Sequence, residues 1–472
     1  MRRFIVISAL AVVVATSVQV SIPAFAGVPR VLIVEGHGWG HGRGMGQYGA
    51  RALAAAGTGW YRILPRYYTG IHLERRTSPQ RIRVLLLHSR SVVVKGDSQA
   101  SIVSAGKLIA STKRGAVYFW IGRSGSAAVI KVARSSAGPW RTVATLAPRV
   151  IGVSGARQAA IVGSSSQRWY RGSLEIVASG RGVDVINNVD LERYVAEVVP
   201  REMPASWPLN ALKAQAVAAR TYVLRVAEVA RARHKSYDIC GSDACQVFGG
   251  YARTINGTYQ VLESHSSNVA VWSTAGWIMT WQHKLILAEY SSSTGGYTTS
   301  GAVPYLAARP DPWDISSPFH SWSEAIDVSQ IQARWPAVGS VQAVRVISRD
   351  GRGDFGGRAQ LLLISGARGS LRVSAAEFRN AFGLPSDWFR VLGSQSQYRF
   401  TFNMSVGSRD AAVRFLQERL RAEGVYPKGA PLSNYFGPIT RAAIERYQRA
   451  QHINPTGFLG PLTRARLNAS AS

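Results

Sequence analysis

The stretch DLERYVAEVVPREMPASWPLNALKAQAVAARTYVL, residues 190–224, decides the fold of its part of the chain because it encodes two helices and the corner between them. Asp190 is the expected N-cap of the first helix, and Pro200 is its expected end. Ser206 is the expected N-cap of the second helix, with Pro208 in the first turn, where its missing N–H does no harm. Apolar residues at helical spacing predict the buried faces: Leu191, Tyr194, Val195 and Val198 in the first helix, and Leu212, Ala216, Ala219 and Val223 in the second.

Glu202 lies in the corner between these two helices. Met203 precedes Pro204, and a residue before proline is pushed out of helical geometry, so we expect a short extended corner here. The carboxyl group has apolar neighbours such as Val199 and Trp207, and such surroundings disfavour its charged form and raise its pKa. A general acid at neutral pH requires that property. The alternative is an exposed loop glutamate without a chemical role.

The chain on either side of this stretch predicts an α+β fold. Residues 81–186 contain short β-branched and aromatic runs such as RIRVLLLHSRSVVVK, AVYFWIG and AAVIKVA, separated by Gly, Ser and Asp, which predict antiparallel strands. We therefore expect a mixed helical and antiparallel β domain over residues 27–400, with a β-rich insert at 81–186. The segments SRDAAVRFLQERLRAEG, NYFGPITRAAIERYQRAQ and GFLGPLTRARLN predict a small three-helix module over residues 408–472.

The chain opens with MRRFIVISALAVVVATSVQVSIPAFAG, which has the basic start, apolar run and small-residue cleavage site of a secretory signal peptide over residues 1–26. The apolar run is shorter than the roughly 20 residues that a membrane span needs, so we expect a secreted protein. The 56 Lys and Arg against 26 Asp and Glu give a net charge of +30, which implies a polyanionic partner or a means of solubility. Anionic wall polymers fit a secreted protein better than nucleic acid, for which the sequence holds no recognition motif.

A second unusual stretch, GHGWGHGRGMGQYGA at residues 36–50, has glycine at seven of the fourteen positions from Gly36 to Gly49. Glycines let a backbone approach a ligand closely. The stretch is not a dinucleotide-binding fingerprint, because no strand–GxGxxG–helix unit with a later acid is evident. Three interpretations remain: contact with a substrate, a metal held by His37 and His41, or a structural loop packed beneath a site.

Five separated segments resemble the stage II sporulation protein D/LytB family, over about residues 30–395. LERYVAEVVPREMPASWPLNALKAQAVAARTYVL (191–224) is similar to the family's signature, and YDICGSDACQVFGG (237–250) to its central loop. EYSSSTGGYT (289–298) with VPYL and DPWD, VSAAEFRNAFGLPSDWF (373–389) and the glycine-rich opening resemble the other segments. That opening closes the domain in many relatives, so the order here is permuted, which requires the two ends of the domain to lie close in space. The three-helix module resembles peptidoglycan-binding domains.

The resemblance implies a lytic transglycosylase that cleaves peptidoglycan glycan strands, with Glu202 as its acid by the REMP match. The C6 hydroxyl of the sugar would be the nucleophile and a 1,6-anhydro end the product, so one carboxylate suffices where an ordinary glycosidase needs two. For the residues outside the corner, a solvated helix face or a plain surface loop is the structural alternative. The residues expected to contact the glycan are His37, Trp39, His41, Gln47, Tyr48, Lys213, Gln215, Arg220, Ser292 and Ser293.

Cys240 and Cys245 are the only two cysteines, and a secreted context favours a disulfide between them. The alternative, which the family keeps open, is a zinc site with His234 as a third ligand. The expected chemistry itself requires no cofactor. The rival function is a non-catalytic modifier that binds peptidoglycan and stimulates a wall amidase, in which case Glu202 is structural.

Overall fold

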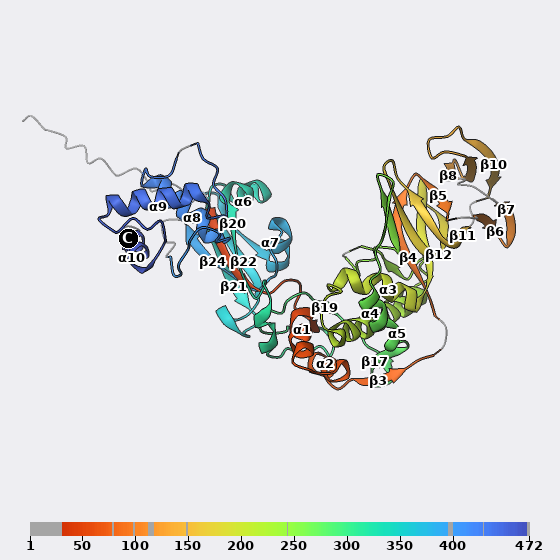
Figure 1. Ribbon diagram of the computed structural model, residues 1–472, viewed down its shortest axis with the longest axis horizontal. Coiled ribbons are helices and arrows are strands. Elements are labelled where there is room, and N and C mark those ends of the chain that lie inside the picture. The colour runs from red at the N-terminus through yellow and green to blue at the C-terminus, as the bar shows by residue number, and fades with distance from the viewer. Residues whose placement is uncertain are drawn as a thin grey trace, which may run out of the picture.

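The computed structural model describes residues 31–469, except 78–79, 98–99, 112–117, 148–149, 243, 395–399 and 428. Two lobes rise from a common base, which contains α1 and α2 (Figure 1). The signal peptide expected over residues 1–26 lies outside the described residues. Within the described part of the chain, we find no helix with the length and apolar character needed to cross a membrane.

One lobe is built on a large sheet, which confirms a β-rich part in an α+β fold; the sheet also includes strands after residue 186. Its strands are antiparallel to their neighbours, except that β14 joins its edge in parallel beside β4. The central path runs β10-β9-β8-β5-β11-β12-β13-β4-β14, with β6, β7, β15 and β16 attached to it. The strands are β4 (Arg81–Ser89), β5 (Ser91–Gly96), β6 (Ser101–Ser104), β7 (Lys107–Ser111), β8 (Tyr118–Ser124), β9 (Ala127–Ala133), β10 (Arg141–Leu146), β11 (Ile151–Val162), β12 (Ser166–Ser179), β13 (Gly182–Asp190), β14 (Ile239–Cys240), β15 (Ala252–Ile255) and β16 (Thr258–Val261).

Helices α3 (Leu191–Glu202), α4 (Leu209–Ala232) and α5 (His265–Ser273) pack together at one end of this sheet. Asp190 caps α3 as predicted, because its Oδ1 accepts the N–H groups of Glu192 and Arg193 at 3.0 and 3.3 Å. The eight residues predicted to form the buried faces of α3 and α4 are all buried. They place the two helices against the same apolar core.

Two predicted helix boundaries are wrong. α3 does not end at Pro200 but continues to Glu202, because the N–H of Met203 still bonds to the carbonyl of Val199 at 3.0 Å and closes the last turn. Ser206 does not cap α4: the chain first forms a turn in which the Trp207 N–H reaches the Pro204 carbonyl, and Pro208 takes the cap position. The corner therefore lies two residues later in the chain than expected, and Glu202 is held on a helix end.

The other lobe is organised around β1 (Val31–His37), the middle strand of a three-stranded antiparallel sheet with β20 (Ser321–Asp327) and β24 (Phe389–Ser394). The pairing of β1 with β24 places the start of the family-like region beside its end, as the permuted order requires. Leu32 and Val34 belong to a core on one face of this sheet. That core includes residues of β21 (Val341–Arg349), β22 (Ala359–Gly366), β23 (Gly369–Ser374), α6 (Val328–Arg334) and α7 (Ala375–Phe382).

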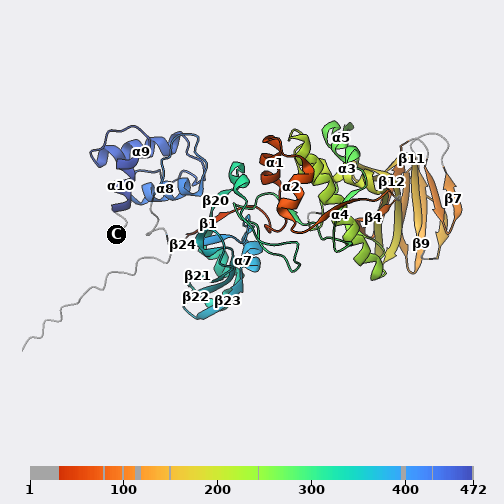
Figure 2. The ribbon, with the colours of Figure 1, turned by 90° about the horizontal axis from the view of Figure 1, so that it is seen from below.

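The C-terminal segment forms the predicted three-helix module, with α8 (Ala411–Ala422), α9 (Pro438–Ala450) and α10 (Pro461–Ala469). Val31 and Ile33 alternate with Leu32 and Val34 along β1, so their side chains point to the opposite face of the sheet. There they share one apolar core with the module, which lies beyond this sheet in Figure 2. The module is thus docked on the lobe by apolar contacts.

We expect Ile33→Ala to loosen this docking. Ile33 is fully buried in the shared core, and truncation of a buried isoleucine costs about 2–4 kcal/mol. Small-angle X-ray scattering should show a larger radius of gyration for the variant at a temperature where both folded parts persist. Val34→Ala is the matched control, because it truncates the neighbouring residue on the opposite face. Equal radii for the two variants would contradict the docking role of Ile33.

The base joins the glycine-rich stretch to the Ser/Gly-rich segment. β2 (Met45–Gly46) pairs in parallel with β19 (Tyr290–Ser291), and the bridge between Trp39 and Ser293 extends this contact. The remaining elements of the base and its surroundings are α1 (Gln47–Ala55), α2 (Trp60–Tyr67), β3 (His72–Arg75), β17 (Trp277–Trp281), β18 (Lys284–Leu285) and the 3₁₀ turns at Pro312–Ser316, Pro336–Val338 and Asp354–Gly356.

Candidate functional site

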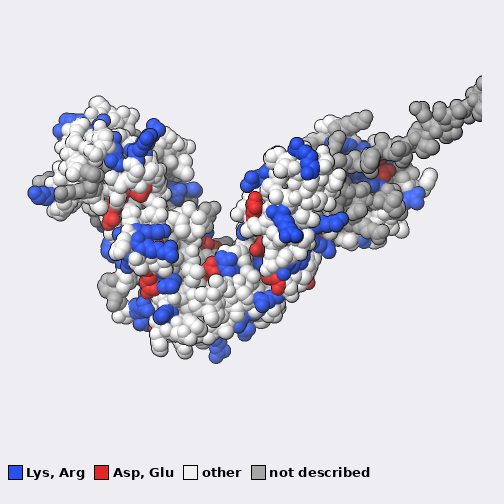
Figure 3. All heavy atoms as spheres, turned by 180° about the vertical axis from the view of Figure 1, so that it is seen from behind, with Lys and Arg blue, Asp and Glu red and all other residues white. Residues whose placement is uncertain are grey.

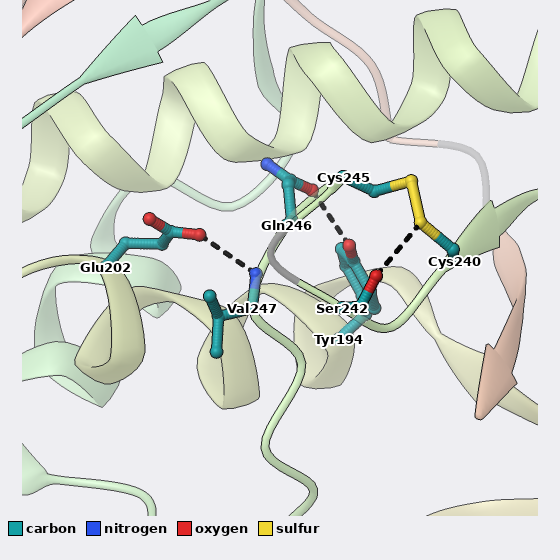
Figure 4. The surroundings of a disulfide bond; sticks show 7 residues. All are labelled: Tyr194, Glu202, Cys240, Ser242, Cys245, Gln246 and Val247. Carbon is teal, nitrogen blue, oxygen red and sulfur yellow. Dashed lines mark hydrogen bonds between the residues drawn. A yellow bond between two sulfur atoms is a disulfide. The ribbon is translucent and has the colours of Figure 1, made fainter. Parts of the chain in front are cut away.

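Glu202 is the last residue of α3, and the chain becomes extended at the next residue, Met203, as predicted. Met203 has extended backbone angles, φ −130° and ψ 138°, because the following proline excludes the helical conformation. The Glu202 side chain is half-buried. The backbone N–H of Val247 donates a 3.0 Å hydrogen bond to Oε1 of Glu202, as Figure 4 shows.

The surroundings of Glu202 raise the pKa of its carboxyl group. Burial is the cause of the rise, because removal from water disfavours the charged carboxylate. Hydrogen bonds from the Val247 N–H and from the side chains of Tyr290 and Gln47 oppose the rise without cancelling it. Among the described residues, no neighbouring carboxylate contributes to the shift. Glu202 therefore retains its proton to a higher pH than an exposed glutamate, and it does so as a single acid.

A chain of buried hydrogen bonds lies beside Glu202. The Tyr194 hydroxyl donates to Oε1 of Gln246 at 2.8 Å, and Nε2 of Gln246 donates to the Tyr290 hydroxyl at 2.9 Å. Tyr290 in turn hydrogen-bonds with Glu202. The sequence had given no indication of a functional role for these three residues. Gln246 and Tyr290 lie in segments quoted for the family resemblance, but no spacing in the sequence indicates that they meet.

Several glycines of the 36–50 stretch lie in close contact with other parts of the protein. Gly38, Gly40, Gly42 and Gly44 all have positive φ angles between 65° and 102°, which glycine adopts without steric cost. A Cβ atom at Gly38 would lie 2.8 Å from the Ser293 carbonyl oxygen, and one at Gly44 would collide with the Glu289 carbonyl. Gly38, Gly40 and Gly44 let the stretch pack tightly against residues 289–295, and Gly42 leaves room for the Arg358 side chain, which favours the structural interpretation of the motif.

Two members of the glycine-rich stretch reach the helix corner: Gln47 contacts the acid, and Tyr48 contacts Trp207. Gln47 interacts with Glu202 and also donates to Oε1 of Gln215 at 3.4 Å. The Tyr48 ring packs edge-on against Trp207, with centroids 4.9 Å apart. Two more aromatic rings continue this row: the centroids of Tyr48 and Phe319 are 6.5 Å apart, and those of Phe319 and Trp39 are 4.4 Å apart. Trp39 is 44% exposed, so this aromatic row leads from the corner of Glu202 to the surface.

His37 and His41 do not face a common point. His37 is buried at the end of β1, where its Nδ1 donates to the His320 carbonyl at 3.0 Å and its ring packs against Phe355 and Trp388. Nδ1 of His41 accepts the Arg43 N–H at 3.0 Å, and burial lowers the pKa of His41 to about 4. Residues 31–469, as far as described, contain no cluster of three His, Cys, Asp or Glu side chains suited to a metal ion.

The predicted contacts on α4 divide into two groups. Gln215 is fully buried beneath Gln47, and Lys213 is half-buried nearby on the same helix. Arg220 lies apart from the site: its fully buried guanidinium pairs with Glu192 through bonds of 2.6 and 2.9 Å and also donates to the Trp277 carbonyl at 3.1 Å. This pair borders a cavity of about 490 Å³ whose lining does not include Glu202. The structure thus removes Arg220 from the candidate site.

The two predicted serines have structural contacts. The Ser292 carbonyl accepts the backbone N–H of Tyr48 at 3.1 Å, which fixes the start of α1. Ser293 is buried, and its hydroxyl donates to Oδ2 of Asp314 at 2.7 Å. Ser292 therefore lies beside the site through its backbone, while the Ser293 hydroxyl is directed into the protein.

Cys240 and Cys245 form a disulfide (Figure 4), with Cα atoms 5.8 Å apart. Zinc binding requires free thiolates, and the zinc alternative with His234 would need both of these sulfurs. The residues present therefore do not fit a zinc ion while the disulfide exists. The disulfide lies directly before Gln246 and Val247, the two residues that contact Glu202 or its neighbours.

The positive charge is not concentrated at the site. Figure 3 shows Lys and Arg scattered over both lobes, on either side of a hollow between them. Arg51 is the cation placed over the aromatic row, with its guanidinium 5.9 Å from the Tyr48 ring and 5.4 Å from the Trp207 ring. A scattered positive surface attracts polyanions in general without selecting one.

Comparisons with known proteins match two parts of this architecture. Residues 179–281, which carry Glu202 and the disulfide, match the family described as Stage II sporulation protein, and residues 409–467 match a peptidoglycan binding domain family. The chain is 38% identical over 143 residues to the "Amidase enhancer" of Bacillus subtilis, and 33% identical over 159 residues to the "Stage II sporulation protein D" of the same organism. It is 27% identical over 253 residues to "Stage II sporulation protein D" of Bacillus amyloliquefaciens.

The coverage of these alignments differs. They include 29%, 32% and 50% of this chain, and 17%, 46% and 70% of the respective relatives. The chain thus spans less than half the length of the two Bacillus subtilis relatives. The glycine-rich stretch lies outside the segment that matches the family model, whereas the helix corner, the disulfide loop and α4 lie within it. Residues 179–281 are thus similar to the stage II sporulation protein family, and residues 409–467 are similar to peptidoglycan-binding domains.

Proposed function

We propose that this protein is a lytic transglycosylase that cleaves peptidoglycan glycan strands and leaves 1,6-anhydro-N-acetylmuramic acid ends. The observation that carries the proposal is Glu202 itself: a half-buried acid on a helix end, with a raised pKa and a hydrogen bond from the Val247 N–H. An acid with a raised pKa keeps its proton to a higher pH than an exposed glutamate, and this proton is what a general acid donates to a leaving oxygen.

The reaction needs only this acid and the substrate. Protonated Glu202 donates its proton to the glycosidic oxygen as the bond from that oxygen to C1 of N-acetylmuramic acid breaks. The C6 hydroxyl of the same sugar then forms a bond to C1, and the Glu202 carboxylate accepts the hydroxyl proton. The products are the 1,6-anhydro end and a free hydroxyl on the departing strand, and Glu202 is again protonated. A conventional glycosidase would need a second carboxylate at a set separation.

The rest of the chain supports binding to the same polymer. Trp39 and Tyr48 lie in the aromatic row that leads from the acid to the surface, and aromatic faces suit the apolar faces of sugars. The Gln47 amide lies beside Glu202, where it would hydrogen-bond to hydroxyl or acetamido groups. The C-terminal domain would keep the catalytic lobe at the wall by raising its effective concentration there. We place the protein outside the cytoplasm, with anionic wall polymers as a further partner of its positive surface.

The second candidate is a non-catalytic modifier that binds peptidoglycan and stimulates a partner amidase. The name of one relative, "Amidase enhancer", favours this second candidate. Under this alternative the site binds glycan or the partner, and the raised pKa of Glu202 has no chemical use.

One experiment separates the two candidates. Purified full-length protein is incubated with glycan strands that carry stem peptides and with strands that lack them, and the products are identified by mass spectrometry. New 1,6-anhydro ends formed by the protein alone support the lytic transglycosylase. An absence of cleavage on both strands, with faster peptide release by an added wall amidase, supports the modifier and rejects our proposal.

The pH dependence of cleavage follows from the direction of the Glu202 pKa shift. The proton must be present for the first step, so the rate should be constant below the pKa and fall as the pH rises through it. Because burial raises this pKa, the fall should lie above pH 4.5, the ordinary value for glutamate. Gln47→Leu removes one hydrogen bond that opposes the rise and should move the fall to still higher pH. An alkaline limb at or below pH 4.5 would contradict the assignment.

A further inference from the structure

The disulfide lies next to the two residues that contact the acid and its neighbours. Directly after Cys245, Gln246 hydrogen-bonds to Tyr194 and Tyr290, and Val247 donates its backbone N–H to Glu202. Figure 4 shows Tyr194, Gln246 and Val247 between the disulfide on one side and the Glu202 carboxyl group on the other. The backbone path of residues 245–247 therefore sets the positions of the Gln246 side chain and the Val247 N–H.

Gln246 gives the hydrogen-bond chain a direction. An amide side chain accepts through its oxygen and donates through its nitrogen. The oxygen accepts the Tyr194 hydroxyl, and the nitrogen donates to the Tyr290 oxygen. Since the Tyr290 oxygen already accepts a hydrogen from Gln246, its own hydrogen is free to be donated to Glu202, with which it hydrogen-bonds. The orientation of Gln246 thus helps to aim a donor at the acid.

Cys240 and Cys245 differ in how they are held. Cys240 belongs to β14, which pairs with β4, and the next N–H, that of Gly241, bonds to the Leu85 carbonyl at 2.9 Å. The Cys245 N–H bonds to the Ser242 carbonyl within the same loop, so this bond does not tie Cys245 to the sheet. The disulfide supplies that tie. Along the chain, Gln246 then contacts Tyr194, Tyr290 and the Ala219 carbonyl through its side chain. The Phe248 ring follows three residues after Cys245, stacked on Tyr194 with centroids 5.1 Å apart.

We infer that the Cys240–Cys245 disulfide is a positioning element for Glu202, which holds Gln246 and Val247 in place and makes the site sensitive to reduction. The inference deepens the proposed function, because it concerns the same acid. Both cysteines are half-buried, within reach of a small dithiol. Reduction breaks the S–S bond and forms two cysteine thiols with two electrons and two protons from the dithiol, which itself becomes a disulfide.

The test measures the pKa of Glu202 directly, by carbon NMR of the full chain labelled in its glutamate carboxyl groups. Glu202→Gln identifies the signal. In the Cys240→Ser/Cys245→Ser variant the hydrogen-bond donors to Glu202 lose their alignment, while Phe248 still covers the loop. The pKa of Glu202 should therefore rise further by about one unit, which is the effect of one hydrogen bond to a charged group. Gln246→Met, with the disulfide intact, should shift it in the same direction. Dithiothreitol should reproduce the rise in the unmodified protein and have no effect on the double serine variant.

Ser242→Ala is the matched control. It removes a hydroxyl that contacts Cys240 Sγ at 3.6 Å in the same loop but keeps the disulfide, so the Glu202 pKa should be unchanged. An unchanged Glu202 pKa after reduction or in a folded double serine variant would overturn the inference, and so would a fall toward the ordinary value. If the double variant does not fold, the dithiothreitol and Gln246→Met measurements decide. The titration needs no substrate, so it can fail while glycan cleavage persists, or succeed where cleavage is absent.

Discussion

Glu202→Gln is expected to lower the rate of 1,6-anhydro end formation by about 10²–10⁴-fold, the usual contribution of a general acid. Glutamine has nearly the same size, and its side-chain oxygen still accepts the Val247 N–H that now bonds to Oε1. The substitution therefore removes the transferable proton with little change in packing. Mass spectrometry of the released ends measures the loss, and sedimentation with purified walls should show unchanged binding, because the C-terminal domain is untouched.

Glu228→Gln is the matched control for this prediction. It makes the same change of charge on α4, at a carboxylate that is 48% exposed and pairs with Arg225 on the surface. Cleavage by this variant should equal that of the unmodified protein. A Glu202→Gln protein that retains cleavage within a few-fold of the original would show that the proton comes from another group, and the mechanism proposed for Glu202 would then be wrong.

Glu192→Leu is expected to cost about 3–5 kcal/mol of unfolding free energy, because it leaves a buried cation without its partner. The Arg220 side chain is fully buried, and Glu192 accepts from it at 2.6 and 2.9 Å. Glu192 also accepts the Gly276 N–H at 3.0 Å, so two segments lose their connection at once. Urea unfolding followed by circular dichroism measures the loss as a lower midpoint.

Two further variants test whether the loss of stability comes from the burial of the Arg220 charge or from the loss of an ion pair as such. Glu228→Leu removes the exposed partner of Arg225 on the same helix, and such a surface pair contributes only about 0–1 kcal/mol. Glu192→Leu/Arg220→Met removes both buried charges and should recover part of the loss, since an uncompensated buried charge costs more than an absent pair. A double variant less stable than Glu192→Leu alone would show that the other bonds of Arg220, to the Trp277 and Val271 carbonyls, are the more important ones.

The sequence predicted correctly several features that depend on residues close together in the chain. The Asp190 cap, the buried faces of α3 and α4 and the extended conformation of Met203 depend on residues within a few positions, and all agree with prediction. The errors at Pro200 and Ser206 are also local. There, a hydrogen bond from Met203 and the turn ending at Trp207 outweighed the general preferences of proline and serine.

The candidate site could be predicted only in part. The apolar residues around Glu202 in the sequence were enough to predict it as the acid. The structure brings Gln47 to this acid and Tyr48 to the corner, although both lie more than 150 positions earlier in the chain. Arg220 had the sequence pattern of a solvated or substrate-binding helix face, but its partner Glu192 on α3 draws it into the interior. Gln246, Tyr290 and Phe319 gave no signal, because each acquires its role from a segment distant in the chain.

The sequence by itself determined the α+β class, the helix corner with its acid, the β-rich insert and the C-terminal three-helix module, because periodicity, capping and proline geometry act over a few residues. Only the tertiary structure decided that Gly38, Gly40 and Gly44 pack against residues 289–295, that β1 carries the C-terminal module on one face, and that the disulfide loop reaches the acid. These contacts join segments far apart in the chain. Their geometry is selected by the packing of the whole fold, which no local pattern encodes.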